Sequence, residues 1–196
     1  MRSLMKSAAV AAILLAPASA QAVVIDFNGL TGTGTEPRGS TYTEDGFELF
    51  STEGGQFHSI HSGATQFTGT VSFLLNSNGG HSNLTKIGGG AFDLVSIDLD
   101  SGQEINGASV TFTGVLADAS TVSQSFTTDT TVPGLQTVAF GAAFDNVVQV
   151  IWAQHIPFHT FDNIVVEAGT ETVPEPMSLS LLGAGLSGIA AIRRRR

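Results

Sequence analysis

The C-terminal segment most constrains how this chain can fold. It reads Pro174-Glu175-Pro176, then an apolar stretch at 177–192, then four arginines, Arg193, Arg194, Arg195 and Arg196. Proline lacks a backbone N–H and fits neither a helix interior nor a central strand, so a folded domain must end before residue 174. The stretch at 177–192 carries no charge and predicts a membrane helix. The arginines that follow it favour a cytoplasmic C-terminus.

The apolar stretch is short for a membrane span. At about 1.5 Å per residue it covers roughly 24 Å, against a hydrocarbon core of about 30 Å, and snorkelling arginines can absorb the difference. The alternative is a buried helix of the domain itself. The stretch shows no polar stripe, and a soluble core helix has no need of four arginines at its end.

The order of these three parts resembles the PEP-CTERM sorting signal of Gram-negative bacteria, which ends in a Pro-Glu-Pro motif, a short membrane helix and a basic tail. The resemblance implies an exported protein whose precursor is anchored in the inner membrane. It also implies that an exosortase-type enzyme processes the chain near Pro174-Glu175-Pro176. The mature protein is then expected at the cell surface or outside the cell.

Residues 1–20 predict a secretory signal helix. Arg2 and Lys6 form its basic region, 8–16 is apolar, and Ala18-Ser19-Ala20 fits the small-residue cleavage rule, so the mature chain is expected to begin at Gln21. The predicted layout is therefore signal 1–20, folded domain 21–170, linker 171–176 and membrane helix with basic tail 177–196. The chain contains no cysteine, so the exported domain must rely on core burial or a metal for stability.

The folded domain is strongly acidic. The formal net charge is −9, yet Arg38 and Lys86 are the only basic residues between Gln21 and Val173. Such a domain repels phosphate backbones, so nucleic-acid binding is not expected.

The domain reads as all-β, because Gly, Thr, Ser, Val and Phe dominate and no stretch sustains a helical period. In the expected strand at 92–100, the side chains of Val95, Ile97 and Leu99 share one face. Residues 28–40 and 76–90 are expected to be loops, and 118–120 a turn. The expected class is an antiparallel β-sandwich of jelly-roll type. Its strands are expected at 23–27, 41–51, 56–60, 65–75, 92–100, 108–115, 122–126, 136–140, 147–152 and 161–167.

The amino-acid sequence of several expected strands resembles that of the carbohydrate-binding-module-like jelly rolls found in exported PEP-CTERM proteins. The matching stretches are Val24-Ile25-Asp26-Phe27, the aromatic-rich 42–50, Phe144-Asp145-Asn146-Val147 and the closing Phe161-Asp162-Asn163-Ile164. The resemblance spans most of residues 22–168 and implies the same sandwich fold.

Asp162 is the principal candidate for a metal ligand. A period of two puts it on the same face as Ile164 and Val166, and a buried carboxylate needs a partner. With few basic residues, that partner is a set of backbone N–H groups or a hard cation such as Ca²⁺. In the resembling jelly rolls, a last-strand Asp helps to hold a structural calcium, which here implies Asp162 with Asp26 or Asn28. The alternative is that Asp162 bonds only neighbouring backbone.

Other site chemistries have weaker signals. His155 and His159 flank Pro157 and allow a zinc site, whereas His58 and His61 fall on opposite faces of a strand. No nucleophile elbow, phosphate loop or dinucleotide motif is present in the sequence. A paired-acid glycosidase would show two carboxylates roughly 5 to 9 Å apart in a pocket.

The sequence favours an exported, non-enzymatic protein of the cell surface or matrix, associated with exopolysaccharide or biofilm. One alternative is a carbohydrate-binding module proper, with a glycan site on loops 28–40, 76–90 or 153–160. Its weakness is the scarcity of sugar-stacking rings, since Trp152 and Tyr42 are the only Trp and Tyr. A second alternative is a small secreted hydrolase.

Overall fold

The computed structural model describes residues 21–102, 107–129 and 134–169. The expected signal helix, the sorting segment and the membrane helix lie outside these residues, and within them no helix is long and apolar enough to cross a membrane. The described chain forms thirteen strands and one 3-10 helix, η1 (Ala142–Phe144). The strands are β1 (Val23–Ile25), β2 (Thr35–Gly39), β3 (Thr41–Glu44), β4 (Phe47–Thr52), β5 (Phe57–Ile60), β6 (Ser72–Leu75), β7 (His81–Lys86), β8 (Phe92–Asp100), β9 (Ser109–Leu116), β10 (Thr121–Thr127), β11 (Gln136–Ala139), β12 (Val147–Ala153) and β13 (Thr160–Ala168).

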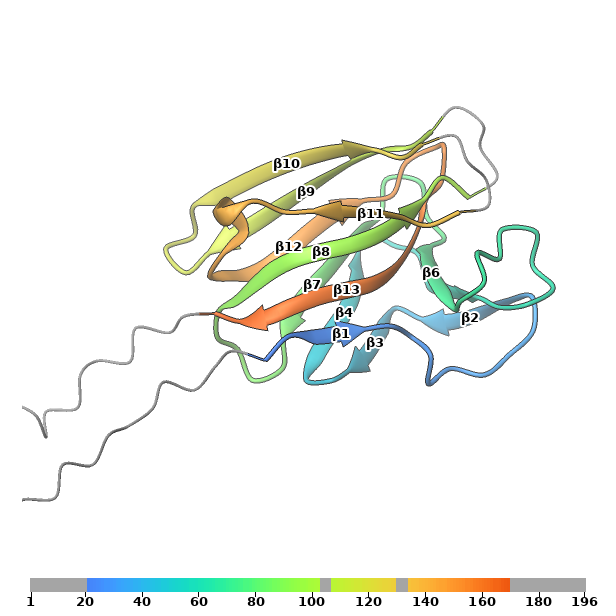
Figure 1. Ribbon diagram of the computed structural model, residues 1–196, viewed down its shortest axis with the longest axis horizontal. Coiled ribbons are helices and arrows are strands. Elements are labelled where there is room, and N and C mark those ends of the chain that lie inside the picture. Colours follow the sequence, from blue (N-terminus) through green and yellow to red (C-terminus); the bar gives the residue numbers. More distant parts are fainter. Residues whose placement is uncertain (1–20, 103–106, 130–133, 170–196) are drawn as a thin grey trace, which may run out of the picture.

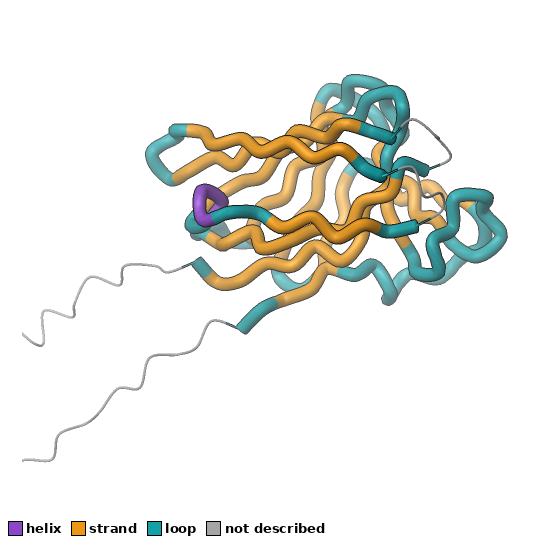
Figure 2. The backbone as a smooth tube through the Cα atoms, turned by 45° about the horizontal axis from the view of Figure 1, so that its top comes forward, coloured by secondary structure: helices purple, strands orange, loops and turns teal. Residues whose placement is uncertain are grey.

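The strands form two antiparallel layers, which confirms the predicted all-β sandwich (Figures 1 and 2). The front layer runs β11-β8-β13. The far edge of β13 pairs with β1 along one part and with β6 at Phe161, and β5 and β2 continue from β6. The back layer runs β10-β9-β12-β7-β4-β3. One residue pair, Val147 with Phe92, joins the two layers by strand pairing.

Aromatic side chains fill the space between the layers. The rings of Phe27 and Phe73 stack 4.1 Å apart, and the ring of Phe161 stands edge-on to both. Trp152 is 2% exposed and meets Phe161 edge-on at 5.2 Å, so it is a core residue and not a sugar platform. Tyr42 packs against Phe27 and Phe73. Such ring pairs contribute about 0.5–1.5 kcal/mol each beyond their buried area.

Most strand predictions are confirmed, and β8 has the predicted bounds. One detail of β8 is wrong: Val166 pairs with Leu94 and Val165 with Ser96, so Val95 is the extra residue of a bulge. The bulge turns Val95 away from the core face that Ile97 and Leu99 share.

Four sequence assignments are corrected by the structure. The predicted strand at 41–51 is a hairpin, because Asp45 and Gly46 have φ of 47° and 83° and form its two-residue turn. The predicted loop 28–40 contains β2, an edge strand that tolerates Pro37 because its outer side needs no partner. The predicted loop 76–90 contains β7, a central strand whose only large apolar residue is Leu84. Of the predicted strand at 65–75, only the last four residues form β6.

The two ends of the sandwich differ in their connections (Figure 1). We call the end from which both described chain termini leave the tail end. There, short links join β3 to β4, β7 to β8 and β9 to β10. The predicted turn at 118–120 is confirmed, with Ala119 at φ 65° and the Ser120 N–H bonded to Asp118. At the opposite end, which we call the pocket end, the longer connections gather, among them 61–71 and 154–159.

Candidate functional site

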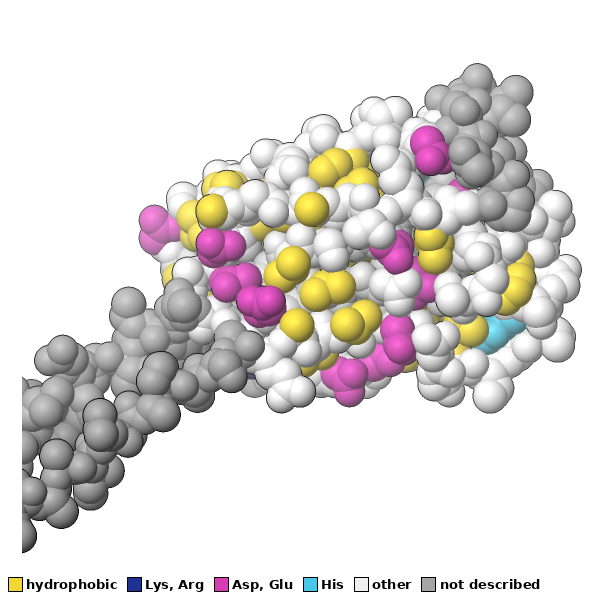
Figure 3. Space-filling view, viewed as in Figure 1, with side chains coloured by type: hydrophobic (Ala, Val, Ile, Leu, Met, Phe, Trp, Pro, Cys, Tyr) yellow, Lys and Arg dark blue, Asp and Glu magenta, His cyan; other side chains and the backbone are white. Residues whose placement is uncertain are grey.

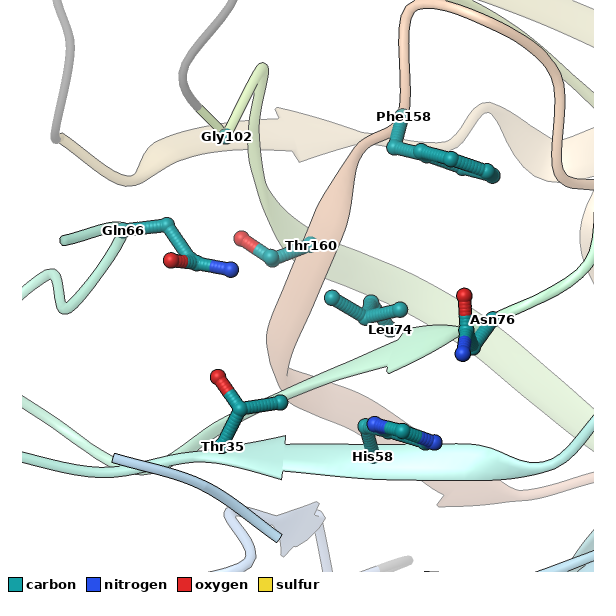
Figure 4. Close-up of a pocket in the computed structure, with 8 residues that line it drawn as sticks. All are labelled: Thr35, His58, Gln66, Leu74, Asn76, Gly102, Phe158 and Thr160. Carbon is teal, nitrogen blue, oxygen red and sulfur yellow. The ribbon is translucent and has the colours of Figure 1, made fainter. Parts of the chain in front are cut away.

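A pocket of about 380 Å³ opens at the pocket end (Figure 4). Its described lining combines hydroxyl, amide and imidazole groups with two apolar side chains and carries no carboxylate. This size lies at the lower end of the range for small-molecule sites. The lining residues are Thr35, His58, Gln66, Leu74, Asn76, Gly102, Phe158 and Thr160.

Strand register explains one wall of the pocket. On β5 and β6, His58 and Leu74 are cross-strand partners and therefore share a face. The alternate residues Phe57 and Phe73 point into the core, where both are fully buried. The wall is thus the outer face of a sheet whose other face holds the domain together, which gives the pocket a rigid base.

Thr160 is the most informative residue of the pocket. It begins β13, its side chain is 2% exposed, and its hydroxyl has no hydrogen-bond partner within the described chain. Figure 4 shows this hydroxyl pointing across the pocket in the direction of Gln66. A buried polar group left unpaired costs about 1–3 kcal/mol, and a hydrogen bond from a ligand or from ordered water would remove this cost.

The pocket gathers the three loops that the sequence marked for a glycan site. Thr35, Asn76 and Phe158 come from 28–40, 76–90 and 153–160 respectively. Thr160 also lies within 153–160, whereas the sequence analysis did not mark His58, Gln66, Leu74 or Gly102 for this site. Nothing in a linear pattern indicates that Gln66 or Gly102 folds back over the start of β13.

Asp162 is buried as expected, but on the outer side of the front layer. It pairs directly with Asp98, whose neighbours Ile97 and Leu99 face the core, while Phe161 and Ile164 both lie in the core. The reason is a bulge at Asn163, which adopts φ 46° and interrupts the period of two. The prediction that Asp162 shares the face of Ile164 is therefore wrong.

The Asp162 carboxylate is held by two donors. Its Oδ2 accepts a bond from Thr70 Oγ1 at 2.5 Å, and its Oδ1 accepts one from the Asn163 N–H at 2.7 Å. Burial raises the pKa of Asp162 to about 7, and the nearby Asp98 and Asp26 carboxylates add to the rise. Asp98 is bonded in turn by Thr137 Oγ1 at 2.6 Å and by Asn163 Nδ2 at 2.8 Å.

The proposed calcium ligands lie in one region without forming a finished metal site. Asp26 is close enough to influence the pKa of Asp162, and its Oδ1 accepts the Asn28 N–H at 3.0 Å. Across the described residues, no group of three His, Asp or Glu side chains is arranged to hold a metal ion. A calcium site at Asp162, Asp26 and Asn28 stays a prediction.

The histidines are separated by their surroundings. His159 is fully enclosed, and burial, with a contribution from His155, lowers its pKa to about 3. His81 sits 3.2 Å from the Glu53 carboxylate. His61 Nε2 lies 2.8 Å from Ser59 Oγ and 2.9 Å from Arg38 Nη2.

The Ser59–His61 contact does not form a nucleophile and base pair. Ser59 is fully buried, and its oxygen also accepts a bond from Arg38 Nε at 2.6 Å. Burial and the Arg38 guanidinium both lower the pKa of His61. The cluster instead ties loop 26–34 to β5, because Arg38 Nη2 also donates to the Thr31 carbonyl at 2.8 Å.

Comparison with known proteins gives one sequence match and a distant set of structural likenesses. Residues 172–196 match the PEP-CTERM protein-sorting motif. The fold is similar to a point mutant of CBM29-2, a family 29 carbohydrate-binding module, at 11% identity and a TM-score of 0.46 over 82% of this chain and 95% of that one. It is also similar to CBM29_1, a family 29 module from Piromyces equi, at 7% identity and a TM-score of 0.43 over 83% and 99%. No curated protein matches the chain.

Proposed function

We propose that the protein is an exported, non-enzymatic β-sandwich that associates with exopolysaccharide at the cell surface or in the extracellular matrix. The observation that carries the proposal is the sorting motif at 172–196, which begins three residues after the last described residue of the domain. A sorting motif indicates export, so the ligands that the domain meets are those outside the cell.

The route that we propose has two stages. The precursor is held in the inner membrane by 177–192, with Arg193–Arg196 on the cytoplasmic side, and an exosortase-type enzyme then acts near Pro174-Glu175-Pro176. The mature domain passes to the surface or the matrix.

The position of the pocket supports a binding role. The chain leaves toward the sorting motif from the tail end, whereas the pocket lies at the opposite end (Figure 1). A domain tethered through its C-terminus would therefore present the pocket away from the tether. Longer loops at that end are the usual place for recognition.

The pocket lining supports the non-enzymatic part of the proposal over the hydrolase alternative. Its described residues carry no carboxylate pair, and the Ser59–His61 contact is buried and held by Arg38. The carbohydrate-binding module proper is the second candidate function. One observation favours it: all three loops marked for a glycan site meet at this pocket.

The test follows the full chain through the cell and onto polysaccharide. Cells expressing the intact protein are separated into cytoplasmic, membrane and extracellular fractions, and mass spectrometry locates both termini of each form. We expect the extracellular or surface form to begin at Gln21, to end near residue 174 and to co-sediment with isolated exopolysaccharide. A matched chain lacking 172–196 keeps the secretory signal, so it should leave the membrane fraction but fail to accumulate at the cell surface. Intact protein confined to the cytoplasm, or a mature form that ignores the polysaccharide, would overturn the proposal.

A further inference from the structure

We infer that the pocket binds one neutral sugar unit, at a chain end or branch of the polysaccharide, and that the Thr160 hydroxyl is its buried recognition group. This inference rests on the proposed function and deepens it, because it names the ligand class and the residue that selects it.

Charge disfavours an acidic sugar at this site. The described lining carries no Lys or Arg, and Arg38 is occupied by Thr31, Ser59 and His61. Lys86 lies at the tail end, beside the turn between β7 and β8. A uronate or sulfated unit would thus enter without a Lys or Arg side chain to pair it, at a cost that a neutral sugar avoids.

The acidic front face adds to this discrimination, and a buried carboxyl group lies behind the wall. Thr160 pairs across the strands with Asp100, which is 1% exposed. The Asp100 carboxylate accepts the Gly102 N–H at 3.1 Å and the Gly134 N–H at 3.2 Å, and burial raises its pKa. Figure 3 shows that carboxylates also dominate the charged side chains on the front face of the molecule. An anionic ligand is repelled by this field.

The polar groups of the lining match sugar hydroxyls. A hydroxyl both donates and accepts, as do Thr35 and Thr160, while the amide of Asn76 has both a donor and an acceptor. Thr160 stands apart because its oxygen is enclosed and unpaired. A ligand hydroxyl that reaches it completes a hydrogen bond that bulk water reaches poorly.

The apolar groups match the carbon face of a sugar ring. Phe158 and Leu74 both line the pocket, and Figure 4 places the Phe158 ring on one side and Leu74 on its base. Trp152 is in the core and Tyr42 packs on core rings, so neither builds an open stacking platform. The pocket is small, about 380 Å³, so a single unit at an end or branch fits better than the middle of a long chain.

The experiment titrates the full chain in detergent micelles with methyl glycosides of glucose, galactose, mannose, N-acetylglucosamine and glucuronic acid, followed by NMR and calorimetry. We expect at least one neutral glycoside to bind and the glucuronide to bind at least about tenfold more weakly. Thr160→Val keeps the shape but removes the hydroxyl, and should weaken neutral-sugar binding by about tenfold. Thr160→Ser keeps the hydroxyl and should bind within about threefold of the wild type. Phe158→Ala should also weaken binding by several-fold.

The outcomes separate this inference from the proposed function. Thr111→Val, which removes an exposed hydroxyl of β9 at a distance from the pocket, is the matched control and should leave binding unchanged. Co-sedimentation with exopolysaccharide that survives Thr160→Val and Phe158→Ala, or equal binding of the glucuronide, would overturn the inference and leave the proposed function standing. Failure of the intact protein to bind exopolysaccharide at all would overturn both. If Thr160→Val lowers the Tm of the protein, Thr160→Ser and Phe158→Ala are compared instead. Sugar binding that is weakened by Phe158→Ala and kept by Thr160→Ser then supports the site.

Discussion

The pocket end and the tail end of the sandwich bury different kinds of side chain. At the tail end the buried residues are apolar, among them Phe47, Phe92 and Val166. The buried polar and charged residues of the described chain lie instead on the strand halves and loops nearer the pocket end. They are Ser59, His61, Ser72, Ser82, Asn83, Asp100, Ser101, Thr128, Gln154, His159, Thr160 and Asp162.

The two ends also differ in whether their buried polar groups have hydrogen-bond partners. The buried side-chain atoms without a partner in the described residues belong to Thr68, Ser72, Ser82, Trp152, Gln154, His159 and Thr160, all toward the pocket end. Buried polar groups are normally satisfied, and each exception costs free energy. The pocket end therefore keeps buried polar groups that have no partner within the described chain and that a ligand or ordered water could satisfy.

The largest expected effect is on stability at the tail end. Phe92 is fully buried and its ring stands edge-on to Phe47 at 5.2 Å, so Phe92→Ala should cost about 3–5 kcal/mol of unfolding free energy. Phe158→Ala, at the half-buried rim of the pocket, should cost about 1 kcal/mol or less. Urea unfolding of both variants measures the difference. Similar costs for the two would contradict the division between the ends.

The next largest expected effect is a pH dependence of the unfolding free energy, caused by Asp162. Its folded pKa of about 7 lies above the unfolded value of about 3.9, so the folded state holds a proton that the unfolded state releases. Stability should fall as pH rises from about 4 to about 7, by an amount on the order of 4 kcal/mol, and then level off. Unfolding of the wild type and Asp162→Asn across this range measures it, since the variant cannot titrate.

The control for this titration is Asp118 at the tail end. It is exposed, and hydrogen bonds from Ser120 lower its pKa, so its stabilising contribution is present above its unfolded pKa and is lost as pH falls. Asp118→Asn should therefore keep the decline between pH 4 and 7. A decline that persists in Asp162→Asn would show that another group causes it.

Calcium should have a smaller effect at the same carboxylate. A cation that binds only the folded state adds about 2.7 kcal/mol at a hundredfold excess over Kd and about 0.4 kcal/mol when its concentration equals Kd. We expect Ca²⁺ to raise Tm by about 1–10 °C, Mg²⁺ to do less, and Asp162→Ala to abolish the rise. Thermal melts with each ion test this. Equal responses to the two ions would indicate general screening of an acidic surface, and Asp162 would be bonded only by Thr70 and Asn163.

The smallest expected effect on stability comes from the sorting tail. Deleting 177–196 should release the protein from membranes while leaving its unfolding free energy unchanged, because the described domain closes through its own core. Membrane fractionation and urea unfolding of the shortened chain measure the two results. A shortened chain that aggregates or loses cooperative unfolding would show that the tail packs on the tail end of the sandwich.

Most strands could be predicted from the sequence because apolar and polar residues alternate along them. Residues 92–94, 96–100 and 109–113 alternate apolar and polar side chains, so the existence of these two strands followed from period two. His81–Lys86 was missed because its partners on both sides, β4 and β12, bury Ser82 and Asn83 as well as Leu84. In a central strand, pairing rather than pattern decides the structure.

The candidate site was predicted only in part for a related reason. The three glycan-site loops were marked by their Gly, Pro and polar content, but the distance between them in the sequence is large. Gln66 and Gly102 reach the pocket only because the last residues of β5 and β8 lie beside the first residues of β6 and β13.

The sequence by itself determined the all-β class and the position of the sorting motif, because both depend on local order: alternation along a strand, and Pro-Glu-Pro followed by an apolar run and arginines. Tertiary structure alone decided which way Asp162 faces and what Thr160 meets. A single bulge residue, Asn163 at φ 46°, reverses the alternation, and no pattern of residue types encodes where that residue falls. Thr160 and Gln66 line the same pocket through long-range packing, which is set by the closure of the whole sandwich and not by neighbours in sequence.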